Sequence, residues 1–145
     1  IVFLRPLGLP RLYMPMLMGT GGNTGSQAAT LIIRGLATGE VETSDALRIL
    51  WKEIRIGLVI GVILSLFNFA RICLFDRYDV MIALTVCSAM LFIVIFAKVL
   101  GSMVPLLVKK LKLDPALIAN PAISSISDTV ALTIYFAMAS LFLGL

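Results

Sequence analysis

The stretch MPMLMGTGGNTGSQAATLIIRG, residues 14–35, places four glycines between two apolar runs, together with several uncharged polar side chains. In hydrocarbon an unpaired backbone N–H or C=O group costs several kcal/mol, so a helix opens only where protein or water can satisfy the freed groups. The pattern predicts a broken, glycine-containing helix beside a wet site. The alternative is that the glycines only allow neighbouring helices to pack closely. The four glycines are Gly19, Gly21, Gly22 and Gly25.

The composition of the chain indicates that its solvent is a lipid bilayer. Of the 145 residues, 60% are hydrophobic and 14% are charged, and the mean hydropathy is +1.07. A soluble domain is about 45 to 50% apolar. A signal peptide does not account for the excess, because apolar stretches recur up to the last residue. Two cysteines are too few for a disulfide framework, and their spacing does not suggest zinc.

Four apolar segments reach the length of about 20 residues that a membrane crossing requires. They cover approximately residues 12–37, 54–74, 80–108 and 116–145. We therefore expect an all-α, polytopic membrane helix bundle over residues 12–145, and we expect residues 1–11 to form a segment that does not cross. Gly57 and Gly61, four residues apart, are expected to let a second helix approach closely.

The distribution of Lys and Arg predicts the orientation of the bundle. One basic cluster surrounds residues 39–53 and another lies at residues 109–112, whereas the charges of residues 71–79 balance. Since loops rich in Lys and Arg stay in the cytoplasm, we place both clusters there, and residues 71–79 and the C-terminus outside. Basic residues interleaved with aromatic ones, which would favour nucleic-acid binding, do not occur.

Asp128 is the acidic residue that we expect deep inside a crossing. The other seven acids, Glu53 among them, fall in predicted loops or at segment ends. A carboxylate within a membrane helix costs at least about 2.5 kcal/mol, so Asp128 is a functional candidate that should face a cavity or a partner. The competing interpretation is an internal salt bridge from Asp128 to Lys98.

Helical spacing gives Asp128 polar neighbours. Asn120, Ser124 and Asp128 are successive fourth residues and share one face of a helix, with Ser125 beside them. These hard oxygen ligands suit Mg²⁺, which keeps most of its water. We expect Mg²⁺ as the transported ion, held by Asp128, Ser124 and Asn120. The residues expected to line the pathway are Gly19, Gly21, Gly22, Asn23, Ser26 and Ser125.

Two long segments resemble a known family. Residues 19–41, GTGGNTGSQAATLIIRGLATGEV, and residues 113–136, LDPALIANPAISSISDTVALTIYF, are similar to the two signature stretches of the transmembrane domain of the MgtE family of magnesium channels. The resemblance implies a homodimer in the inner (plasma) membrane, with a central pore built by the glycine-containing helix and the last helix. The family's pore acid matches Asp128, and its polar positions match Asn120 and Ser124.

The resemblance also implies parts that we do not find in this chain. Family members carry a cytosolic region with paired CBS modules that sense magnesium, followed by five membrane helices, and we find neither the sensor nor the first helix. Three other functions compete with a channel, and one of them, a purely structural membrane subunit without a pathway, predicts that Asp128→Asn leaves ion flux unchanged. An intramembrane aspartyl protease needs two facing acids, and Ser-His chemistry needs a histidine that the sequence lacks, so we do not expect an enzyme. A secondary cation transporter that works by alternating access remains the alternative.

Overall fold

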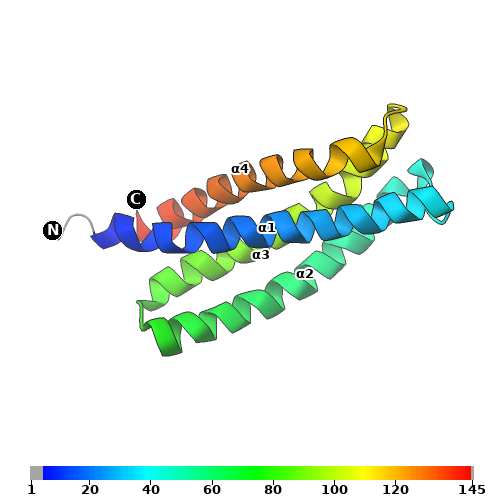
Figure 1. The fold of residues 1–145 in the computed structure, drawn as a ribbon. Helices are drawn as coiled ribbons and strands as arrows, with labels where there is room; N and C mark the ends of the chain where they lie inside the picture. Colours follow the sequence, from blue (N-terminus) through cyan, green and yellow to red (C-terminus); the bar gives the residue numbers. More distant parts are fainter. Residues whose placement is uncertain (1–4, 145) are drawn as a thin grey trace.

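The chain folds into four long helices that run alternately up and down. The computed structural model describes residues 5–144. Figure 1 shows the termini at one end of the bundle and the loops after α1 and after α3 at the other end. The helices are α1 (Arg5–Thr38), α2 (Ala46–Arg71), α3 (Val80–Lys110) and α4 (Pro115–Leu143); a 3-10 turn, η2 (Thr43–Asp45), precedes α2, and a π-helical turn, η3 (Ile72–Asp76), follows it.

The predicted all-α membrane bundle is confirmed, since the described residues contain helices and no strand. Three segments of the described chain are long and apolar enough to cross a membrane: Thr43–Asp76, Val80–Lys110 and Pro115–Leu143. They match the second, third and fourth predicted spans. The first predicted span is not among them, although α1 has 34 residues, because glycines and polar side chains fill its central turns. α1 begins at Arg5, within the segment that we expected not to cross.

The predicted break in the glycine-containing helix is wrong. α1 is one α-helix from Arg5 to Thr38. A Cβ atom at Gly25 would lie 2.8 Å from Cγ2 of Ile123 and 3.3 Å from the carbonyl oxygen of Ala97. Gly25 thus meets α3 and α4 at closer range than any side chain permits. The glycines keep their helical hydrogen bonds. Close packing against α3 and α4, and not a break in the helix, explains why position 25 is a glycine.

Glycines also bring α2 and α3 together, as the sequence predicts. A Cβ atom at Gly57 would lie 3.1 Å from Cα of Ile95, and one at Gly61 would lie 2.8 Å from Cδ1 of Leu91. α3 is the central helix of the bundle, because it packs against α1, α2 and α4.

The contact between Gly101 of α3 and Gly25 of α1 yields a stability prediction. A Cβ atom at Gly101 would overlap the carbonyl oxygen of Gly25, whereas one at Gly19 would meet nothing within 4 Å. We expect Gly101→Ala to lower the free energy of unfolding by about 3 kcal/mol, because rigid backbone must move. Gly19→Ala should instead stabilise the helix by about 0.5 to 1 kcal/mol. Unfolding in detergent micelles measures both; equal effects would contradict the close approach of α1 and α3.

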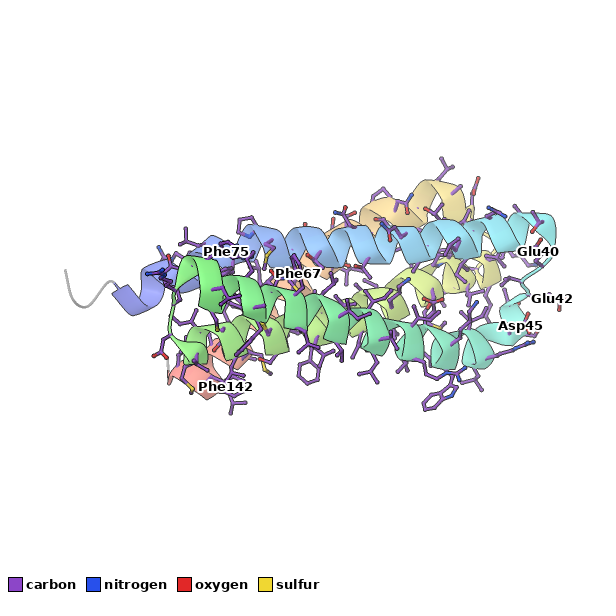
Figure 2. The ribbon with its side chains drawn as sticks, turned by 90° about the horizontal axis from the view of Figure 1, so that it is seen from below. Glu40, Glu42, Asp45, Phe67, Phe75 and Phe142 are labelled. Carbon is purple, nitrogen blue, oxygen red and sulfur yellow. The ribbon has the colours of Figure 1, made fainter. Side chains whose placement is uncertain are left out.

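The two ends of the bundle carry different loop residues. Figure 2 shows Glu40, Glu42 and Asp45 where α1 meets α2, and Phe75 and Phe142 near the opposite end. Both basic clusters of the sequence flank the end that carries these acids, since residues 39–45 and 111–114 connect the helices there. The predicted separation of the basic loops from residues 71–79 is therefore present in the fold.

A polar cluster fastens α1 to the turn between α2 and α3. The hydroxyl of Tyr13 donates a hydrogen bond to Oδ2 of Asp76 at 2.9 Å, and Nη1 of Arg71 lies 3.2 Å from the same oxygen. The guanidinium carbon of Arg71 is 5.8 Å from the centre of the Tyr13 ring. This end of α1 is thereby fixed to the bundle by hydrogen-bonded and charged groups.

Candidate cation site

The predicted acid, Asp128, lies near the middle of α4. Asp128 is half-buried. A Cβ atom at Gly22 of α1 would lie 3.9 Å from its Oδ1 atom, so the carboxylate sits beside a stretch of α1 that carries no side chain. α1 and α4 thus meet at Asp128 and leave the carboxylate partly accessible.

The rest of the predicted stripe is exposed on the same helix. Asn120, Ser124 and Ser125 are exposed, one and two turns before Asp128. A face of α4 with four polar side chains would be unstable in contact with lipid, because lipid offers these groups no hydrogen-bond partners. The stripe therefore requires water or another protein surface.

α1 contributes a second polar surface. An open hollow on this helix is lined by Asn23, Ser26, Gln27, Thr30 and Leu31. Asn23 and Ser26 were predicted as lining residues. Gln27 and Thr30 were not, although their spacing of four and seven residues from Asn23 is the helical spacing that found Ser124 and Asp128.

The predicted glycines divide between two faces of α1. Gly19 is exposed and Gly22 is half-buried beside Asp128. Gly21 is buried, and a Cβ atom there would lie 3.0 Å from Cγ2 of Ile93 on α3. The packing of Gly21 against α3 lets α1 lie close to α3. That the carbonyl group of Gly21 lines the ion pathway stays a prediction.

Several polar groups on these faces are free to bind an external partner. Thr30 donates its hydroxyl to the carbonyl of Ser26 at 2.9 Å, and Thr129 donates to the carbonyl of Ser125 at 3.0 Å. Within the described residues, the side-chain oxygens of Asn23, Asn120 and Asp128 accept no hydrogen bond from a protein donor. Oxygen atoms that lack an internal donor are suited to face the waters of a hydrated cation.

Lys98 does not pair with Asp128, so the competing interpretation of that carboxylate is wrong. Nζ of Lys98 lies 3.6 Å from Oε2 of Glu53 on α2, and both side chains are less than 10% exposed. We expected Glu53 at the end of a segment, but α2 starts at Ala46 and carries Glu53 into the α2–α3 contact. Lys98 is directed toward α2, and no salt bridge joins it to Asp128.

The described residues bring no three His, Cys, Asp or Glu side chains together as a metal-binding group. Asp128 is the single acid of the polar face, with neutral oxygens around it. A dehydrated metal ion needs more charged ligands than this. The face suits a cation that retains its water.

The fold and this face define a class of protein: a helical membrane domain with a polar, singly acidic surface at mid-membrane depth, as found where ions cross. The chain belongs to the MgtE family, whose family model, described as a divalent cation transporter, matches residues 14–138.

Curated relatives support the same assignment. The chain is 42% identical over 131 residues to a protein of Thermus thermophilus named magnesium transporter MgtE, a match that covers 90% of this chain and 29% of the relative. Proteins of the same name from Bacillus subtilis and Enterococcus faecalis are 31% and 30% identical, over 90% and 91% of this chain and 29% of each relative. The chain thus spans less than a third of the length of these relatives.

Proposed function

We propose that this chain forms the pore of a magnesium channel, with Mg²⁺ as its transported ion. The observation that carries the proposal is the position of Asp128 near the middle of α4, half-buried beside Gly22 and not paired with Lys98. Membership of a family described as a divalent cation transporter supports the ion class. The names of the three relatives support magnesium.

The pathway proposed here runs between α1 and α4 of two copies. Asp128, Ser124 and Asn120 contact the waters of the ion, and Gly19, Gly22, Asn23, Ser26 and Ser125 line the approach. A single bundle leaves these side chains at its surface, where lipid would destabilise them. A two-fold axis beside α1 and α4 supplies a second polar face and a second carboxylate from the same sequence.

The second candidate is a secondary transporter with alternating access. The continuous helix α1 does not favour it, because ion sites in such carriers typically use discontinuous helices. Unitary currents in a planar bilayer separate the two mechanisms, since a carrier turns over too slowly to produce them.

The proposed orientation follows from the basic residues. The basic loops lie in the cytoplasm, and the C-terminus lies outside the plasma membrane.

A cross-linking experiment tests the dimer and the pathway together. Ser124 is exposed on α4, and Phe67 is 70% exposed on α2, away from the polar face. With Cys73 and Cys87 replaced by alanine, Ser124→Cys in the full-length protein should give covalent dimers in lipid with a short bifunctional thiol reagent. The cross-link should also reduce magnesium flux into liposomes at least tenfold. Phe67→Cys, the matched control, should do neither; cross-linking at Phe67 but not at Ser124 would contradict the proposed axis.

A further inference from the structure

Three basic side chains form one stripe near the start of α2. Arg48, Lys52 and Arg55 are spaced by four and three residues, which places them on one helix face, and all three are exposed. α2 packs chiefly against α3. Its opposite side, with Val59 59% and Ile63 60% exposed, faces outward.

The stripe continues into an apolar hollow. Lys52 and Arg55 line the hollow together with Ile56, Val59 and Ile60. Its basic end lies toward the start of α2, and its apolar part extends one to two turns toward the middle of the helix. A ligand that fills the hollow needs an anionic group attached to a hydrocarbon chain.

The carboxylates nearest in sequence do not neutralise the stripe. Oδ2 of Asp45 accepts a hydrogen bond from the backbone N–H of Glu42 at 3.1 Å. Glu53 is buried, and its Oε2 atom lies 3.6 Å from Nζ of Lys98. Arg48, Lys52 and Arg55 therefore present their charge outward.

The hollow lies at the start of the apolar part of α2. Trp51 is 62% exposed beside it, and exposed tryptophan is typical of the interface between hydrocarbon and water. From Arg55 to Arg71, α2 carries apolar side chains except for Gly57, Gly61, Ser65 and Asn68. Lys52 and Arg55 thus precede the apolar part of α2, and their long side chains can extend toward the membrane surface.

We propose that this hollow binds an anionic phospholipid, with the phosphate at Lys52 and Arg55 and the upper part of one acyl chain along Ile56, Val59 and Ile60. The site lies on α2, apart from the α1 and α4 faces, so the inference does not depend on the proposed ion pathway. Near a membrane surface each Lys or Arg strengthens binding of an anionic lipid about fivefold, and the two lining residues together roughly 30-fold.

Lipid binding to the full-length protein in uncharged detergent tests this site. Phosphatidylglycerol and phosphatidylcholine with identical acyl chains are titrated separately, and bound lipid is counted by native mass spectrometry. We expect the wild type to bind phosphatidylglycerol roughly 30-fold more tightly and the variant Lys52→Gln/Arg55→Gln to lose that preference. The control Lys109→Gln/Lys112→Gln removes two exposed charges from the same end of the bundle, outside the hollow, and should keep it.

Three results would overturn the proposal. The wild type could bind both lipids equally, or the control variant could lose as much preference as the Lys52→Gln/Arg55→Gln variant, which would indicate a diffuse surface charge. Inorganic phosphate at the same concentration could displace phosphatidylglycerol, which would show that the acyl chain does not contribute. Because the substituted side chains are exposed, the variants should fold as the wild type does.

Discussion

Asp128→Asn is expected to reduce magnesium flux through the full-length protein about 10- to 100-fold, the range typical of groups that act on a metal ion through its bound ligands. The substitution keeps the shape of the side chain and removes its charge, from both copies in the proposed dimer. A half-buried carboxylate within a membrane helix attracts a divalent cation more strongly than one in water, because its surroundings screen it less. Flux into liposomes loaded with a magnesium-sensitive dye measures the effect.

The structure identifies Asp79→Asn as the matched control. Asp79 is exposed in the turn before α3, whereas Asp76 binds Tyr13 and Arg71, so its replacement would also disturb the fold. We expect the Asp79→Asn variant to transport at the wild-type rate within about twofold. Thermal unfolding adds a readout that does not depend on transport, since a ligand that binds only the folded state stabilises it. Magnesium should raise the unfolding temperature of the wild type and of Asp79→Asn; an equal rise in Asp128→Asn would contradict the assignment of this carboxylate.

Lys98→Met is expected to lower the free energy of unfolding by about 3 to 5 kcal/mol, because it leaves the carboxylate of Glu53 buried without its partner. The double variant Glu53→Met/Lys98→Met removes both charges at similar volume. Its stability should return to within about 1 kcal/mol of the wild type or exceed it. Denaturant titration in micelles gives the three values.

Lys109→Met is the control for this pair, because Lys109 is exposed near the end of the same helix. Its effect should stay within about 0.5 kcal/mol. If Lys98→Met were no more destabilising than Lys109→Met, the 3.6 Å contact between Lys98 and Glu53 would carry no energetic weight. A double variant as unstable as Lys98→Met would show that packing, and not charge, explains the loss.

Much of the fold could be predicted from the sequence because the bilayer imposes simple rules. Apolar runs of the required length predicted three segments that coincide with α2, α3 and α4, and the helix ends lie within a few residues of the predicted ends except at the start of α2. α2 begins earlier than the predicted span, since its first turns are amphipathic and hydropathy alone does not detect them. For this reason Glu53 was assigned to a segment end.

The candidate site was predictable in part. Helical spacing placed Asn120, Ser124 and Asp128 on one face of α4, and the structure leaves the first two exposed and the third half-buried. The same rule would have found Gln27 and Thr30 on α1. Spacing within one helix cannot show which other helix covers a face, so the burial of Gly21 against α3 was not predictable.

The sequence by itself determined that this chain is a bundle of membrane helices with an acid near the middle of the last helix, because hydropathy and helical period act along a single segment. Only the tertiary structure decided that α1 stays intact through its glycines and that Lys98 pairs with Glu53. Both outcomes depend on contacts between helices: Gly25 lets α1 approach Ala97 of α3 and Ile123 of α4, and α2 brings a second buried charge to Lys98. A local sequence pattern indicates that a helix can bend or that a charge needs a partner, but the residue that makes the contact lies on another helix.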